Sequence, residues 1–189
     1  MSEPTIPNAD KIILDLYAGG GGWSEPYAQA GYDVRRFDLL NGHDVRLLLH
    51  QKDRMHGILI ASPCTHLAAS GARWWKHKGE SALLDSLALA DAGLRAVVLY
   101  DPAWWSLENP VGRLSRFYGP PVLTFQPWEY GDPWTKRTCL WGRFQPPAKN
   151  PVEPVEGGKI HRMPPSPDRQ RLRSITPPGF ARAFFEANP

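Results

Sequence analysis

The stretch Lys11–Gly22, with the sequence KIILDLYAGGGG, determines the fold class of this chain. Residues 11–16 form a short, mostly apolar run of the kind found in buried strands, and a tight glycine turn follows at once. Glycines have no side chain, so backbone N–H groups in such a turn can approach a bound molecule closely. The stretch therefore predicts a strand that ends in a ligand-binding loop.

The rest of the chain alternates between strand and helix patterns. A helix is expected near 24–30, and apolar residues recur at helical spacing over 80–99. Further strands are expected at 32–37, 57–62, 104–108, 122–125 and 138–141, the last two around a turn at 131–133. This order predicts an α/β fold with a mostly parallel sheet flanked by helices and with ligands beyond the carboxyl ends of the strands.

Length and composition indicate one soluble domain. The chain has 189 residues, 42% of them hydrophobic and 22% charged, which suits a single packed core. No apolar run reaches the roughly 18 residues of a membrane span, and residues 1–10 lack the basic start and apolar stretch of a secretory signal. We therefore expect a cytoplasmic protein without a membrane partner.

Charge and cysteine content indicate which partners and metal sites to expect. Lys and Arg (22) barely exceed Asp and Glu (19), a weak indication of an anionic partner. Cys64 and Cys139 stand far apart without metal-ligand spacing, so we expect free thiols and no metal site. Arginines gather near the C-terminus, where they would either meet phosphate or form a solvated face: Arg162, Arg169, Arg171, Arg173 and Arg182.

An acidic residue follows the second strand at a distance typical of nucleoside binding. Asp38 lies about 20 residues beyond the glycine turn, where a carboxylate can hold ribose hydroxyls. A phosphate site is the alternative for the turn, but the lysine of a phosphate-binding loop is absent. The pattern favours a cofactor that carries a nucleoside.

The run Asp15–Gly22 resembles the first motif of the DNA cytosine-5 methyltransferases, in which Phe usually stands at the Tyr17 position. The resemblance implies a Rossmann-like, S-adenosylmethionine (SAM)-dependent methyltransferase fold, in which Tyr17 packs on the adenine and Asp38 holds the ribose. Asp44 matches an aspartate that receives the adenine amino group, although a helix-capping role fits equally well. The implied cofactor-binding residues are Asp15, Tyr17, Ala18, Gly19, Gly21, Gly22, Asp38, Asp44, Pro63, Arg173 and Ser174.

The motif Ala61–Cys64 follows a buried strand and matches the family's catalytic Pro-Cys, although Thr65 replaces the usual Gln. We expect the Cys64 thiol at the carboxyl edge of the sheet, near a helix N-terminus that favours the thiolate. A thiolate that adds to cytosine C6 makes C5 enamine-like and nucleophilic. A buried structural cysteine is the alternative.

Two further motifs supply candidate catalytic partners. Glu108, in Leu107–Pro110, resembles the family's Glu-Asn-Val motif; a buried carboxyl with a raised pKa can donate toward N3 of the base, or it can pair with an arginine. The segment 135–141 resembles the tail of a Gln-x-Arg-x-Arg motif, and Arg137 aligns with it. Arg137 would bind cytosine O2, clamp the Cys64 loop, or stand as an exposed cation.

The segment Arg73–Lys78 combines cations with aromatic faces, a mixture that can grip a nucleic-acid backbone and stack bases. Core tryptophans between solvated cations are the alternative. The expected partner is DNA with a cytosine target, single- or double-stranded, while RNA stays open. The expected nucleic-acid-binding residues are Arg73, Trp74, Lys76, Lys78, Arg169 and Arg171.

The chain departs from the family pattern in its domain organisation. Residues 1–145 are expected to form the catalytic SAM-dependent domain, and 178–189 a helix that packs back on it. Between them, about thirty Pro-rich residues (146–177) replace the family's target-recognition region and are too few for a folded reader. The shortness resembles phage or prophage members, which implies low sequence specificity and a bacterial or phage-infected host cell.

A second departure concerns the transferred group. Arg173 stands where the family has an Asn near the methyl donor, and a cation beside a sulfonium is unfavourable. Either Arg173 turns outward to phosphate, or the cofactor is carboxy-S-adenosylmethionine and the product 5-carboxymethylcytosine. A free pyrimidine nucleotide as substrate and a non-catalytic binding module are further alternatives.

Overall fold

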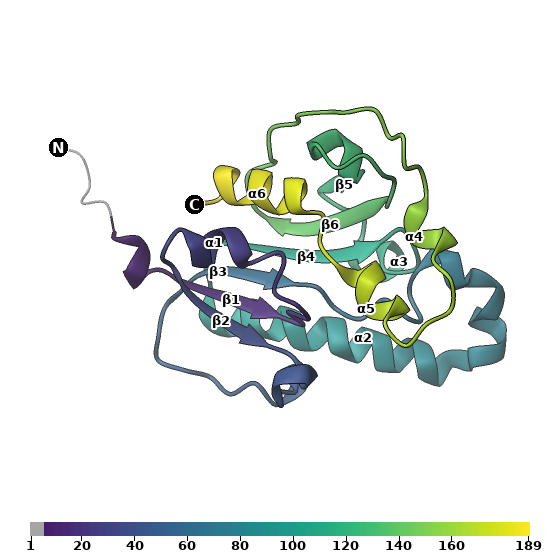
Figure 1. Cartoon of the computed structure of the whole chain (residues 1–189). Helices are drawn as coiled ribbons and strands as arrows, with labels where there is room; N and C mark the ends of the chain where they lie inside the picture. The colour runs from purple at the N-terminus through teal and green to yellow at the C-terminus, as the bar shows by residue number, and fades with distance from the viewer. Residues whose placement is uncertain (1–5) are drawn as a thin grey trace.

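Six strands form one sheet in the order β2-β1-β3-β4-β6-β5 (Figure 1). The computed structural model describes residues 6–189. The expectation that residues 1–10 carry no secretory signal therefore falls partly outside the described residues. Neighbours from β2 to β4 pair in parallel, whereas β6 runs antiparallel to β4 and β5. This confirms the expected Rossmann-like α/β sheet. The strands are β1 (Ile12–Leu16), β2 (Asp33–Phe37), β3 (Met55–Ile60), β4 (Trp104–Pro110), β5 (Leu123–Phe125) and β6 (Thr138–Arg143).

Helices cover both faces of the sheet. The long helix α2 (Trp75–Tyr100) lies on one face, and α1 (Glu25–Gln29) and α6 (Pro178–Ala187) lie on the other (Figure 1). No helix within residues 6–189 has the length and apolar character needed to cross a membrane. The remaining helical segments are short: α3 (Ser115–Tyr118), α4 (Lys159–Arg162), α5 (Arg169–Ser174), and the 3₁₀ helices η1 (Asn8–Asp10), η2 (Leu39–Asn41), η3 (Val45–Leu47), η4 (Ala69–Trp74) and η5 (Pro127–Tyr130).

Two segments differ from the sequence-based expectation. The helix expected from residue 80 begins earlier: residues 73–78 form the end of η4 and the first turn of α2, with a break at Gly79, where φ is 72°. The Pro-rich segment, expected to be irregular, contains α4 and α5. Arg, Gln and Leu dominate α5, and their good helix propensity explains a helix where apolar periodicity gave no signal.

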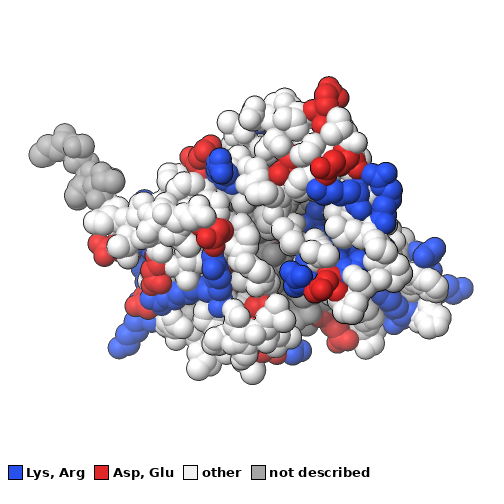
Figure 2. Space-filling view, in the orientation of Figure 1, with Lys and Arg blue, Asp and Glu red and all other residues white. Residues whose placement is uncertain are grey.

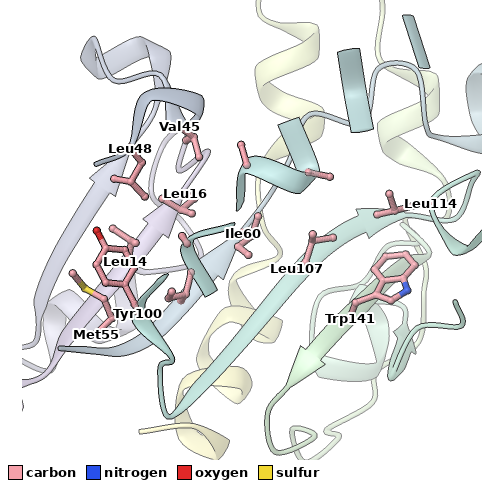
Figure 3. Packing of buried hydrophobic residues seen from close by; sticks show 14 of the residues in the cluster. Leu14, Leu16, Val45, Leu48, Met55, Ile60, Tyr100, Leu107, Leu114 and Trp141 are labelled. Atoms are coloured by element: carbon pink, nitrogen blue, oxygen red, sulfur yellow. The ribbon is translucent and has the colours of Figure 1, made fainter. Parts of the chain in front are cut away.

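Apolar side chains fill the space on both faces of the sheet. The cluster under α2 includes Leu14, Leu16, Ile60, Leu107 and Trp141 (Figure 3). The opposite cluster is rich in aromatic residues, and the rings of Phe125 and Phe180 stack with centroids 3.9 Å apart. This stack joins β5 to α6, so the C-terminal helix belongs to the same core.

Candidate active site

The glycine turn follows β1 at the carboxyl edge of the sheet. Gly21 has φ 73° and lies under Arg36, since a Cβ there would come within 2.5 Å of Arg36 Nε. A Cβ on Gly19 or Gly20 would meet no atom within 4 Å. The turn therefore has open space in front of its first two glycines, while Arg36 closes it from behind.

Asp15 is the buried support of this turn. The hydroxyl of Ser24 donates to Asp15 Oδ2 over 2.6 Å and accepts from Arg36 Nε over 3.0 Å, and Arg36 also pairs with Glu25 at 2.8 Å. Burial raises the pKa of Asp15 to about 6, against the opposing effects of the Ser24 hydrogen bond and the Arg36 charge. Asp15 thus lies behind the turn, where it holds Ser24 and through it Arg36.

Asp38 lies beside the same turn. Its Oδ2 accepts from the backbone N–H of Gly19 and its Oδ1 from that of Leu40, both at 2.9 Å. A carboxylate has about four acceptor positions, so two remain for the hydroxyls of a ribose. Asp38 therefore lies next to the glycines, as the sequence predicted.

Tyr17 and Asp44 are both engaged with protein groups. The Tyr17 hydroxyl donates to the carbonyl of Leu89 in α2 over 2.6 Å, and its φ is 62°. Asp44 caps η3 through the N–H of Arg46 and forms an ion pair with the Arg46 side chain at 2.5 Å. The helix-capping alternative for Asp44 is therefore present, and its predicted contact with adenine stays a prediction.

The turn that carries Cys64 is fastened to the end of β4. Asn109 Nδ2 donates to the carbonyl of Ser62 over 3.0 Å, and Gly112 approaches so closely that a Cβ there would lie 2.0 Å from the Leu67 carbonyl oxygen. Backbone hydrogen bonds of 2.8 Å join Ala69 to Val111 and Arg113 to Leu67. Pro63 is exposed at the tip of this turn.

The expected thiolate-favouring environment of Cys64 is not found. The N–H groups of Leu67 and Ala68 bond back to the Cys64 carbonyl in a single turn, and the next helix, η4, starts at Ala69. Burial and the charge of Glu108 raise the pKa of the Cys64 thiol, while Lys136 and Arg173 oppose the shift. The prediction of a lowered thiol pKa is wrong, although the free thiol at the sheet edge is present.

Glu108 faces the same space as Cys64. It pairs across the ladder with Leu140, whose side chain belongs to the cluster under α1 and α6, so the two side chains share that face. Burial raises the pKa of Glu108, and only Lys136 opposes this. Among the described residues no hydrogen bond or ion pair to the Glu108 carboxyl is found, which leaves it available to a ligand.

Lys136, which the sequence motif did not single out, takes the place expected for Arg137. The charge of Lys136 acts on both Cys64 and Glu108, and its Nζ donates to the Ile175 carbonyl over 3.3 Å. Arg137 is exposed and its charge acts on Cys139 instead, where it opposes the rise in pKa caused by burial. The structure therefore does not bring Arg137 together with Cys64 and Glu108.

The C-terminal segment closes the site from the side of the glycine turn. The Thr176 carbonyl oxygen would lie 3.9 Å from a Cβ on Gly22, and Lys136 holds Ile175. Arg173, two residues earlier, is half-buried and its charge reaches Cys64, whereas Ser174 is exposed and bonds to the Arg171 carbonyl. The charge of Arg173 thus reaches Cys64, while its predicted place beside the methyl donor stays a prediction.

The expected nucleic-acid-binding residues lie on the surface around this edge. Trp74 is 51% exposed and stacks on Arg73, while Trp75 lies half-buried under Arg113 at 4.6 Å. Lys78 bonds to the Thr65 carbonyl, one residue after the nucleophile. Figure 2 shows Lys and Arg gathered on the side where α4, α5 and the start of α2 lie; Lys76 and Arg171 are exposed, and Arg169 is half-buried.

Comparison with known proteins finds similar solved structures. No protein-family profile and no curated protein match the chain. The chain is similar to the crystal structure of an Escherichia coli protein described as a DNA modification methyltransferase encoded within a prophage, with 19% identity, a TM-score of 0.48, and coverage of 76% of this chain and 53% of the other. The chain thus spans about half the length of that protein.

Proposed function

We propose that this chain transfers a one-carbon group from SAM to C5 of cytosine in DNA, with Cys64 as covalent nucleophile and little sequence specificity. The observation that carries the proposal is that the half-buried carboxyl of Glu108, which has no hydrogen bond among the described residues, acts on the Cys64 thiol at the carboxyl edge of the sheet. A thiol and a protonated carboxyl are the two groups needed to add to C6 and to donate at N3 of a cytosine ring.

The residues around the glycine turn fit a nucleoside cofactor. The space in front of Gly19 and Gly20 would be filled by any Cβ, and Asp38 keeps acceptor positions beside it. SAM bound there would supply an electrophilic methyl carbon. Tyr17 and Ala18 bond through their N–H groups to the Phe37 carbonyl, which fixes the turn against the end of β2.

The residues of the chain divide the proposed reaction between them. The Cys64 sulfur, after loss of its proton to solvent, adds to C6 while Glu108 donates a proton to N3, so that C5 becomes the nucleophile. After the group is transferred, water removes the C5 proton, the bond between Cys64 and C6 breaks, and Glu108 recovers its proton from N3. Lys136 stabilises both the thiolate and the ionised Glu108 during this sequence.

The proposed DNA contact uses the basic surface around the site. Arg73, Lys76, Lys78, Arg169 and Arg171 would meet phosphates, and exposed Trp74 would stack on a base next to the target. With no folded reader, affinity should fall steeply with salt and depend little on sequence. Replacing one phosphate-binding cation should lower the log–log salt slope by about one unit for every DNA sequence.

The test is covalent trapping. DNA that contains 5-fluorocytosine should form a stable adduct with the wild-type chain in the presence of SAM, because fluorine cannot leave C5 as a proton. Peptide mapping should place the adduct on Cys64, and Cys64→Ser should abolish both adduct and turnover while cofactor binding is kept. An adduct on Cys139, or full turnover by Cys64→Ser, would overturn the mechanism.

A second candidate rests on Arg173. This cation lies near Cys64 without an ion pair among residues 6–189, which favours a cofactor with an added carboxylate, carboxy-S-adenosylmethionine, and 5-carboxymethylcytosine as product. A free pyrimidine nucleotide is the other substrate that a site without a folded reader would admit. Mass spectrometry of nucleosides from DNA of expressing cells, beside an assay with free dCMP, separates the three outcomes.

A further inference from the structure

We propose that Lys136 and Arg173 form an anion-binding subsite beside Cys64, which receives one carboxylate or phosphate group of a ligand. The inference deepens the proposed function, because the ligand would be the cofactor or the nucleotide of that reaction. It differs from the proposed function in its physical basis, since it depends on charge and not on the nucleophile.

The geometry brings the two cations to one place from distant parts of the chain. Lys136 precedes β6, and its Nζ donates to the carbonyl of Ile175, the residue that caps α5. Arg173 is in the last turn of α5, two residues before that carbonyl. The next residue, Thr176, approaches Gly22 at the open glycine turn. Segment 173–176 therefore connects Lys136 to the glycine turn, and the charges of Lys136 and Arg173 both reach Cys64.

The charges of this cluster are not balanced by the protein. Neither Lys136 nor Arg173 forms an ion pair with any acidic residue in the part of the chain that the structure describes. Glu108 is the acidic group near them, and burial favours its neutral form. Two cations in a half-buried site without a carboxylate partner attract an anion strongly, because the low local dielectric strengthens the interaction.

Arg169 gives an independent indication of the same kind. It is four residues before Arg173, so the two side chains share one face of α5. Its Nε is inaccessible to solvent and has no hydrogen-bond partner. Like charges on one helix face with a buried unbonded donor are unfavourable unless an anion is bound nearby.

The experiment uses two alkylating reagents of nearly equal size. Iodoacetate carries a carboxylate and iodoacetamide is neutral, and each transfers its carbon to the Cys64 sulfur with loss of iodide. Dividing the two rates cancels any effect of a variant on the thiolate fraction. At Cys64, quantified by peptide mapping, the ratio of iodoacetate to iodoacetamide rates should exceed that of N-acetylcysteine.

Three variants give the matched comparison. Lys136→Gln and Arg173→Gln should each lower the ratio about tenfold, the factor that corresponds to one hydrogen bond to a charged group. Arg137→Gln removes the adjacent, exposed cation and should leave the ratio unchanged. A wild-type ratio no higher than that of N-acetylcysteine, or an equal loss in Arg137→Gln, would overturn the subsite.

Calorimetric titration identifies the source of the anion and needs no reactive thiol. If the cofactor supplies it, Lys136→Gln and Arg173→Gln weaken SAM or carboxy-S-adenosylmethionine but not decarboxylated SAM. If a nucleotide supplies it, the same variants weaken dCMP but not deoxycytidine. Variants that bind charged and neutral ligands with unchanged preference would contradict the proposal. Because no turnover is measured, a failed trapping experiment on Cys64 leaves this result independent.

Discussion

The side-chain amide of Asn109 donates a hydrogen bond to the carbonyl oxygen of Ser62 over 3.0 Å, and both residues are buried. Asn109 follows Glu108 in β4, and Ser62 lies two residues before Cys64. A second bond of 3.3 Å reaches the Ser62 hydroxyl. One side chain thus sets the distance between the strand that carries the carboxyl and the turn that carries the thiol.

Asn109→Ala should uncouple the Cys64 turn from the strand that carries Glu108. The variant loses two buried hydrogen bonds, which costs about 1–3 kcal/mol of stability, and kcat should fall more than KM rises because the Cys64 turn loses its anchor. Asn188→Ala is the matched control, since Asn188 is also buried and bonded to Gln145 and Phe184 but does not touch the Cys64 turn. Equal losses of kcat in the two folded variants would show that Asn109 acts only through stability.

Gly112→Ala should displace the nucleophile turn. The added Cβ would stand 2.0 Å from the Leu67 carbonyl oxygen, a backbone atom that cannot rotate away. We expect a lowered melting temperature and, in the folded fraction, an altered alkylation rate of Cys64. Gly71→Ala in the same segment meets no atom within 4 Å and should change neither quantity.

Gly20→Ala separates stability from cofactor binding. The Cβ at this position meets nothing within 4 Å, and φ there is not in the left-handed region, so the melting temperature of the free protein should be unchanged. If SAM occupies the space in front of the turn, its affinity should fall. Calorimetric binding that is unchanged in this variant would place the cofactor elsewhere.

Asp15→Asn should stabilise the protein at neutral pH. The folded pKa of Asp15 is about 6 against an ordinary value of 3.8, so the charged form is disfavoured in the fold. Stability therefore falls as pH rises from 3.8 to about 6 and stays reduced above it. The variant should gain at most about 3 kcal/mol at pH 8 and almost nothing near pH 4. Denaturant melts at both pH values check this, with Asp10→Asn as the control, since Asp10 is exposed and forms no ion pair among the described residues.

Glu108→Gln should make the thiol more reactive and the enzyme less active. Burial is the main cause of the raised pKa of Cys64, and the charge of Glu108 adds to it. Removing that charge lowers the thiol pKa, so iodoacetamide should react faster at pH 8, while turnover falls because Gln donates no proton. Slower alkylation in the variant would show that Glu108 does not act on Cys64 in solution.

The strands and the glycine turn could be predicted because their signals are local. An apolar run followed by glycines has few alternatives, and β1, the turn and Asp38 are found where the pattern places them. The short helix α5 was missed, since it presents no apolar periodicity in a segment dense in proline.

The sequence motif pointed to Arg137, whereas Lys136 is the cation that acts on Cys64 and Glu108. This error has a different cause from the missed helix. The register of β6 against β4 decides which of the two adjacent cations faces the site. In this register Leu140 lies opposite Glu108. A shift of one residue reverses the face, and no local pattern fixes that shift. The direction of the Cys64 pKa was missed for a similar reason, because it depends on burial and on Glu108, which is distant in sequence.

The bond from the Tyr27 hydroxyl to the Asn188 carbonyl spans 161 positions of the chain. On a ribosome, α1 and the first strands emerge long before α6, at a rate of roughly 5–20 residues per second. Until then the aromatic cluster of Trp23, Tyr27 and Trp104 lacks the cover that α6 provides. The nascent chain thus presents an apolar surface of the kind that chaperones bind, and the wall that Thr176 contributes to the glycine turn forms only long after the turn itself has been made.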